Sequence, residues 1–150
     1  MDKFEEGMYE PYIIYSWSFF KKIELSDEDM KLCNDVTIKH ILNNKHHPEY
    51  WEKDKSKYTK FSRKNPNCNT VAYDMDKESI IEMVCDWCAM SKEHHNDPFN
   101  WFEENGIGRW TFTEEQKNKL LASPFIERVL SNHLEYTLEF KQMAVTQYKL

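Results

Sequence analysis

The sequence predicts an all-α fold, a compact bundle of about five to six helices. Three observations lead to this prediction: apolar residues recur at helical spacing, capping residues precede these runs, and prolines or glycines separate them. The chain has 150 residues, of which 40% are hydrophobic, so it is long enough to bury a core but short for two domains. We therefore expect one domain over residues 1–150, with a long loop at about 52–75.

Charge and hydropathy exclude several classes of protein. The net charge is −6, and Lys and Arg gather only in residues 53–64, where acids and aromatics interrupt them. A nucleic-acid partner is therefore not expected. No apolar run approaches the length of a membrane span, and acids stand near the N-terminus where a signal peptide needs bases. We expect a soluble cytoplasmic protein without a membrane partner.

The first two helices are predicted from their end signals. Pro11 suits the first turn of a helix that continues through aromatic and aliphatic residues to Lys21 and Lys22. Ser26 followed by Asp29 resembles a capping box. The second helix is therefore expected to run from about residue 27 to the histidines that begin at residue 40.

The segment from Trp51 to Tyr73 has no clear period and is rich in Lys, Asp, Ser and Asn, which predicts the loop at about 52–75. Long loops without structure are uncommon in compact domains unless they act as lids or are disordered. Tyr58, Phe61 and Tyr73 could hold the segment over the histidines. The alternative is an excursion without such contacts.

A central helix is predicted after the segment. Asp76 is a good N-cap for a helix from Lys77 to about Lys92, whose many apolar residues indicate that it is buried on most sides. Glu82 and Asp86 lie four positions apart on one face of this helix. A buried carboxylate needs a cation, a metal ion or strong donors opposite it. The alternatives are that the pair faces solvent, or that it pairs with a Lys or Arg.

Further helices are expected in the last third of the chain. Pro98 opens a short helix over 99–104. Thr113 with Gln116 forms another capping box, whose helix should stop before Pro124, and a last helix or helix pair follows. No strand pattern competes with these helices.

The four cysteines are expected to be free thiols, mostly buried in a reducing compartment. Cys85 and Cys88 have the CxxC spacing, but Cys33 and Cys68 are isolated and offer no second ligand pair for structural zinc. A redox motif would need a preceding strand and a turn with Gly or Pro. Neither occurs here.

Residues 38–51 contain three of the six histidines, His40, His46 and His47. His40 and His47 are seven positions apart, which is about 20° around a helix. Pro48 should end the helix at this cluster. Imidazoles at a helix end can bind a metal ion when a carboxylate completes the ligand set. The alternative is a solvated terminus, where partly charged imidazoles face the negative end of the helix dipole.

His40, residues 46–51 and residues 82–91 together resemble a family of small, mostly phage and bacterial proteins of unknown function, DUF5662, which is similar in pattern to the HD-domain superfamily of metal-dependent phosphohydrolases. The opening residues 3–12 also resemble the family segment that follows its His-Asp dyad, and the resemblance extends to about Trp101. No histidine precedes Lys3 here. We therefore expect either a reading frame that starts late or a metal site that has lost part of its ligands.

The resemblance implies an HD-like fold and hydrolysis of a nucleotide or another small phosphate ester, helped by a divalent Mn, Fe, Zn, Mg or Ni ion. It implies the following roles: metal ligands His40, His46, His47 and Asp86; catalytic groups Glu82 and Asp86; phosphate contacts Lys45, Asn43 and Asn44.

Two other functions stay open at this point. With the dyad missing, the metal site could be weak or empty, and the protein would be a non-catalytic HD-like module that binds a phosphorylated ligand or a protein. A purely structural helical module would instead hold His46 and Asp86 far apart. The sequence leaves the substrate, the metal and the formation of a homo-oligomer undecided.

Overall fold

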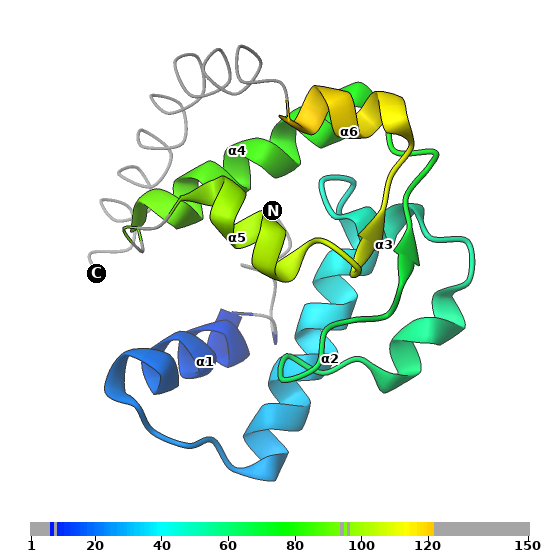
Figure 1. The fold of residues 1–150 in the computed structure, drawn as a ribbon. Helices are drawn as coiled ribbons and strands as arrows, with labels where there is room; N and C mark the ends of the chain where they lie inside the picture. Colours follow the sequence, from blue (N-terminus) through cyan, green and yellow to red (C-terminus); the bar gives the residue numbers. More distant parts are fainter. Residues whose placement is uncertain (1–6, 8, 94, 96, 122–150) are drawn as a thin grey trace.

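The computed structural model describes residues 7, 9–93, 95 and 97–121, and this part of the chain is mostly helical (Figure 1). The helical content agrees with the predicted all-α class. The elements follow one another as helices α1 (Tyr9–Lys21), α2 (Asp27–Asn43) and α3 (Pro48–Trp51), the 3-10 helix η2 (Lys55–Lys60), strand β1 (Thr70–Val71), helices α4 (Lys77–Glu93) and α5 (Pro98–Asn105), strand β2 (Trp110–Thr111) and helix α6 (Glu114–Leu121).

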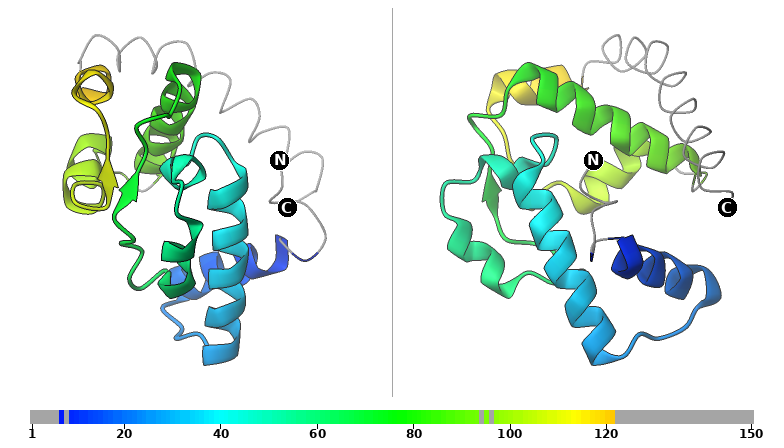
Figure 2. Two further views of the ribbon diagram at one scale, coloured as in Figure 1. Left: turned by 90° about the vertical axis from the view of Figure 1, so that its right-hand side faces the viewer. Right: turned by 180° about the vertical axis from the view of Figure 1, so that it is seen from behind.

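The elements form two groups joined by the strands (Figures 1 and 2). Helix α1 contacts α2, α2 contacts α3, and α3 contacts β1, whereas α4 contacts α5 and α6. Strands β1 and β2 run parallel, with Thr70 opposite Trp110 and Val71 opposite Thr111. The strand pair therefore ties the first group of helices to the second.

The predicted caps of α2 and α4 are confirmed. The Ser26 Oγ accepts a hydrogen bond from the Asp29 N–H at 3.1 Å, and the Asp76 Oδ1 accepts one from the Ser79 N–H at 2.8 Å. Each bond satisfies a backbone donor that has no partner within the helix. The predicted starts of both helices are correct because this signal lies within a few residues. Helix α1 begins two residues earlier than Pro11, which lies in its first turn.

The predicted capping box of α6 is also confirmed, and it has a second role. The Gln116 Oε1 accepts the Thr113 N–H at 2.7 Å, and the Thr113 Oγ1 accepts the Gln116 N–H at 3.2 Å. The Gln116 Nε2 donates to the carbonyls of Ala72, Tyr73 and Met75 at 3.0–3.1 Å. This side chain therefore also holds the segment between β1 and α4.

The segment predicted as a loop at 52–75 contains η2 and β1. Tyr58 and Phe61 are buried against Ile41 of α2, whereas Tyr73 is 55% exposed. The two short strands lie between the helices and were not predicted. Two-residue strands are too short to show an alternating pattern, so their pairing depends on contacts distant in the sequence.

The main core lies between α4, α6 and the strand pair. Its buried residues are Ala72, Met75, Ile80, Met83, Val84, Cys88, Trp110, Phe112 and Leu120. Within the described ranges, none of the helices combines the length and apolar character needed to cross a membrane. The helix predicted to follow Pro124 lies outside the described residues.

Candidate functional site

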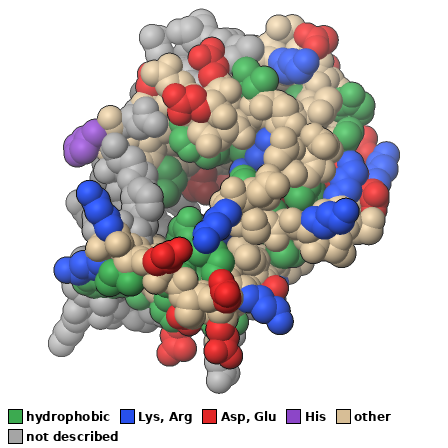
Figure 3. All heavy atoms as spheres, turned by 60° about the horizontal axis from the view of Figure 1, so that its bottom comes forward, with side chains coloured by type: hydrophobic (Ala, Val, Ile, Leu, Met, Phe, Trp, Pro, Cys, Tyr) green, Lys and Arg blue, Asp and Glu red, His purple; other side chains and the backbone are tan. Residues whose placement is uncertain are grey.

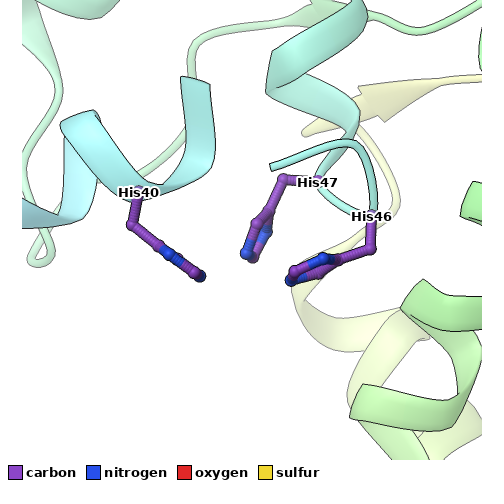
Figure 4. Close-up of side chains that lie close together, drawn as sticks. All are labelled: His40, His46 and His47. Carbon is purple, nitrogen blue, oxygen red and sulfur yellow. The ribbon is translucent and has the colours of Figure 1, made fainter. Parts of the chain in front are cut away.

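The end of α2 and the start of α3 bring the three histidines together. His40 lies in the last turn of α2, which ends at the extended residue Asn44 (φ −113°, ψ 123°). His47 is also extended (φ −99°, ψ 130°) and caps α3, with Pro48 in its first turn. Figure 4 shows the rings of His40, His46 and His47 turned toward the same space. The extended backbone of His47 agrees with the expected effect of Pro48. The expectation that His40 and His47 share one face of a helix is wrong, because α2 ends at Asn43.

The three imidazoles are close enough for all of them to approach one bound ion or molecule. One nitrogen of each ring lies within 4.8 Å of the corresponding nitrogens of the other two. The ring centroids are 4.4 Å apart for His46 and His47, 4.8 Å for His40 and His47, and 5.8 Å for His40 and His46. His40 is only 4% exposed, and the Nε2 atoms of His40 and His47 are shielded from solvent.

Two carboxylates from α4 face the cluster through His46. The Glu82 Oε1 is 3.3 Å from the His46 Nδ1, and the Asp86 Oδ2 is 3.7 Å from the His46 Nε2. The side chains of Glu82 and Asp86 are 64% and 52% exposed. The pair therefore faces solvent, which is one of the alternatives that the sequence left open. The two acids nevertheless contact a histidine more than 30 residues away in the sequence.

The three residues predicted to contact phosphate lie in different surroundings. The Asn44 Nδ2 lies 3.0 Å from the His40 Nδ1 and donates to the His40 carbonyl at 2.8 Å. Asn43 is exposed. Lys45 is exposed as well, and its carbonyl accepts a hydrogen bond from the Trp51 Nε1 at 2.8 Å. Only Asn44 of these three is shown in contact with the cluster.

Sequence reasoning missed a buried carboxylate next to the cluster. Glu49 is 1% exposed, and its Oε1 accepts hydrogen bonds from the Arg109 guanidinium at 2.9 Å and the Trp110 Nε1 at 2.8 Å. The Arg109 guanidinium also lies over the Trp110 ring, 4.5 Å from its centroid. These contacts fix α3, and hence the adjacent His47, to β2. No local signal in the sequence identifies partners 60 residues away.

Glu52 is a second buried acid, 6% exposed, at the end of α3. Burial alone would raise its pKa, but the Lys57 ammonium at 2.6 Å and the backbone N–H groups of Asp54 and Val71 hold the charged form. Together they lower the pKa of Glu52 to about 2. Glu52 is therefore a fixed anion that joins α3, η2 and β1.

The thiols do not form a second site within the described residues. All four cysteines are free. Burial raises the pKa of Cys85 to about 11 and also raises the pKa of Cys88, which keeps both thiols protonated at neutral pH. His95 is exposed, and His94 and His133 lie outside the described residues.

Comparison with known proteins gives one match. A family model described as a family of unknown function (DUF5662) matches residues 3–139. No curated protein and no solved structure matches the chain.

Proposed function

Because the chain belongs to the DUF5662 family, whose function is unknown, we propose its activity from the site: a metal-dependent phosphohydrolase that acts on a nucleotide or another small phosphate ester. One observation carries the proposal: three imidazoles meet with one nitrogen of each within 4.8 Å of the others, and two carboxylates of α4 lie at His46. The class of substrate rests on the resemblance of these segments to HD-domain phosphohydrolases.

The donor set fits a divalent transition metal. Two donors bound to one ion at about 2.1 Å lie no more than about 4.2 Å apart, so modest side-chain rotations would let neighbouring donors of the cluster share an ion. Imidazole nitrogens with a carboxylate suit Mn, Fe, Zn or Ni, whereas Mg prefers oxygen ligands. His46, His47 and Asp86 would hold the ion.

The contacts of His46 support this assignment. Its two ring nitrogens each face a carboxylate, at 3.3 Å for Glu82 and 3.7 Å for Asp86. A histidine that binds a metal usually donates its other N–H to a carboxylate, which fixes the ring orientation. Glu82 is suited to that second role, and Asp86 to the role of a ligand beside the Nε2 of His46.

A bound ion of this kind lowers the pKa of its water and neutralises charge on phosphoryl oxygens. The chain supplies the remaining functions. Glu82 is exposed, so beyond orienting His46 it can accept a proton from the solvent side of the site. Lys45, one residue before His46 and exposed, can attract the anionic substrate.

The test is metal content followed by hydrolysis. The protein is stripped with a chelator, titrated with Mn, Fe, Zn or Ni, and assayed on a panel of nucleotides and phosphate monoesters. We expect one ion per chain and metal-dependent phosphate release. His47→Gln and Asp86→Asn should lose both, whereas Asp74→Asn should keep both, because Asp74 is an exposed aspartate paired with Lys53 elsewhere on the surface.

A second candidate function is a non-catalytic module that binds a phosphorylated ligand. It is favoured by the same contacts of His46, since a protonated imidazole can pair with Glu82 and Asp86 without any ion. Thermal shift against the nucleotide panel, with and without metal, separates the two functions. Stabilisation by a nucleotide in the presence of chelator, with no phosphate release when metal is added, would support the module.

A further inference from the structure

We infer that His40 is not a ligand of the ion but a hydrogen-bond donor beside it, which keeps its proton on Nε2 and offers that N–H to an anionic oxygen of the substrate. The identity of the acceptor rests on the proposed function. The position of the proton does not rest on the proposed function, because it follows from the contacts between Asn44 and His40. The residue that fixes it is Asn44.

The amide of Asn44 has a defined orientation. Its Nδ2 is 2.8 Å from the His40 carbonyl oxygen, which can only accept, and 3.0 Å from the His40 Nδ1. The opposite orientation would place the amide oxygen against the carbonyl oxygen. The NH₂ group therefore occupies this position, and its two protons serve two acceptors on the same residue.

The proton on the imidazole follows from this orientation. An amide nitrogen donates and cannot accept, so the His40 Nδ1 must be the unprotonated acceptor. In a neutral imidazole the proton is then on Nε2, and this nitrogen has no lone pair left for a metal. A ligating histidine needs the reverse arrangement, with the other nitrogen donating to an acceptor. His46, whose nitrogens face carboxylates, can adopt that arrangement, whereas His40 cannot.

The surroundings of His40 suit a donor to an anion. His40 is 4% exposed and its ring lies edge-on to His47, with centroids 4.8 Å apart, so its N–H would lie near an ion held by His47. The ring of Tyr12 in α1 also contacts the His40 ring edge-on, at a centroid distance of 6.0 Å. A buried N–H that meets a phosphoryl oxygen makes a strong, charge-assisted hydrogen bond.

The first experiment measures the proton directly in the metal-free wild-type protein. Long-range ¹⁵N–¹H correlation spectra of ¹⁵N-histidine-labelled protein distinguish the two neutral tautomers and the doubly protonated ring. We expect the His40 signals, identified by their loss in His40→Gln, to show the Nε2-protonated tautomer. An Nδ1-protonated or doubly protonated ring would overturn the inference. This measurement needs no variant apart from the one used for assignment.

The second experiment replaces the hydrogen-bond donor of Asn44, which faces the His40 Nδ1, by an acceptor. In Asn44→Asp the carboxylate can only accept, so His40 should carry its proton on Nδ1 and gain a free Nε2. The matched control is Asn43→Asp, which adds the same charge at the adjacent exposed position. We expect Asn44→Asp alone to change the tautomer and to bind Mn tenfold or more tightly. Equal effects of the two variants would contradict the role of Asn44.

The third experiment separates metal binding from anion binding. His40→Gln keeps an N–H near the position of Nε2, and His40→Leu removes it. Both should retain the Mn ion, but inorganic phosphate should bind the Mn-loaded His40→Leu about 10- to 100-fold more weakly and His40→Gln about as well as wild type. Loss of Mn from both variants, as from His47→Gln, would show that His40 is a ligand. If wild type binds no Mn, the proposed function fails while the tautomer measurement still decides the position of the proton.

Discussion

The protein holds two pairs of carboxylates, one on or next to α3, which follows His47, and one on α4, and they differ in burial and partners. Glu49 and Glu52, at the two ends of the short helix α3, are 1% and 6% exposed and accept hydrogen bonds from fixed donors. Glu82 and Asp86, on α4, are 64% and 52% exposed and face only His46 among the contacts described. The first pair belongs to the framework and the second is available for chemistry.

The difference has a physical cause. A buried carboxylate keeps its charge only when donors surround it, and those donors then restrict its movement. An exposed carboxylate retains water as an alternative partner, so a metal ion or a proton can replace its present contact at small cost. Burial therefore marks the acids that fix α3, which follows His47, and exposure marks the acids that face His46.

The largest expected effect is on stability, in Glu49→Ala. This change leaves the Arg109 guanidinium, which is 16% exposed, without its carboxylate and removes the acceptor of the Trp110 indole. Breaking a buried ion pair by removing one partner costs about 3–5 kcal/mol. We expect a loss of that size in the free energy of unfolding, measured by urea denaturation in the presence of chelator.

The matched variant is Glu82→Ala, which removes the same group from an exposed position. Its expected cost is below about 1 kcal/mol, the usual range for exposed pairs. If Glu49→Ala and Glu82→Ala lose similar amounts of unfolding free energy, the buried pair supports the fold no more than the exposed pair does.

The second prediction concerns pH and Glu52. Its pKa of about 2 lies below the ordinary 4.5, so its charged form stabilises the folded state at pH values above 4.5. That stabilisation, up to about 3 kcal/mol, is lost progressively as the pH falls from 4.5 toward 2. Glu52→Gln should therefore be less stable than wild type at pH 7 and approach it at pH 2 to 3, when urea unfolding is followed across this range.

The control for this experiment is Glu114→Gln. Glu114 is an exposed acid, 82% accessible, paired with Lys117 on the surface of α6. The free energy of unfolding of Glu114→Gln should stay close to that of wild type at every pH. If Glu52→Gln and wild type have the same free energy of unfolding at every pH, the buried hydrogen bonds of Glu52 contribute nothing to folding.

A difference between local and long-range contacts explains how much of the fold the sequence could predict. The starts of α2, α4 and α6 were predictable, because Ser26, Asp76 and Thr113 each bond to a backbone N–H three residues ahead. The strand pair was not, since Thr70 and Trp110 meet only through the fold. Local hydrogen bonds leave a pattern in the sequence, whereas long-range pairing of two-residue strands does not.

The sequence could suggest candidate residues for a site, but not how the fold brings them together. Helical spacing of His40 and His47 was the wrong reason to expect them together, because α2 ends at Asn43 and His47 follows after a turn. The rings meet nevertheless, and the structure places Glu82 and Asp86 beside His46. The many apolar residues of α4 left open whether this acid pair is buried or faces solvent. A count of apolar residues cannot tell which face of α4 packs against the core, because that depends on α5, α6 and the strands.

The third prediction uses the metal as a stabilising ligand. An ion at 100 times its Kd should raise the free energy of unfolding by about 2.7 kcal/mol. In Asp86→Asn this increment should largely disappear, since a neutral amide is a poor ligand, while the stability without metal stays within about 1 kcal/mol of wild type. The measurement is urea unfolding with and without Mn. An undiminished increment in Asp86→Asn would place the ion elsewhere.

The smallest expected effect is that of Glu82→Gln on metal affinity. The amide oxygen can still accept the Nδ1 proton of His46 but carries no charge, so the ring is held less firmly and its other nitrogen is a weaker donor. Loss of such a supporting carboxylate lowers metal affinity about 10- to 100-fold, and we expect the lower end because the acceptor remains. Competition with a chromogenic chelator measures the change. A loss as large as that of Asp86→Asn would make Glu82 a ligand itself, and no loss would leave its 3.3 Å contact with His46 without a role in metal binding.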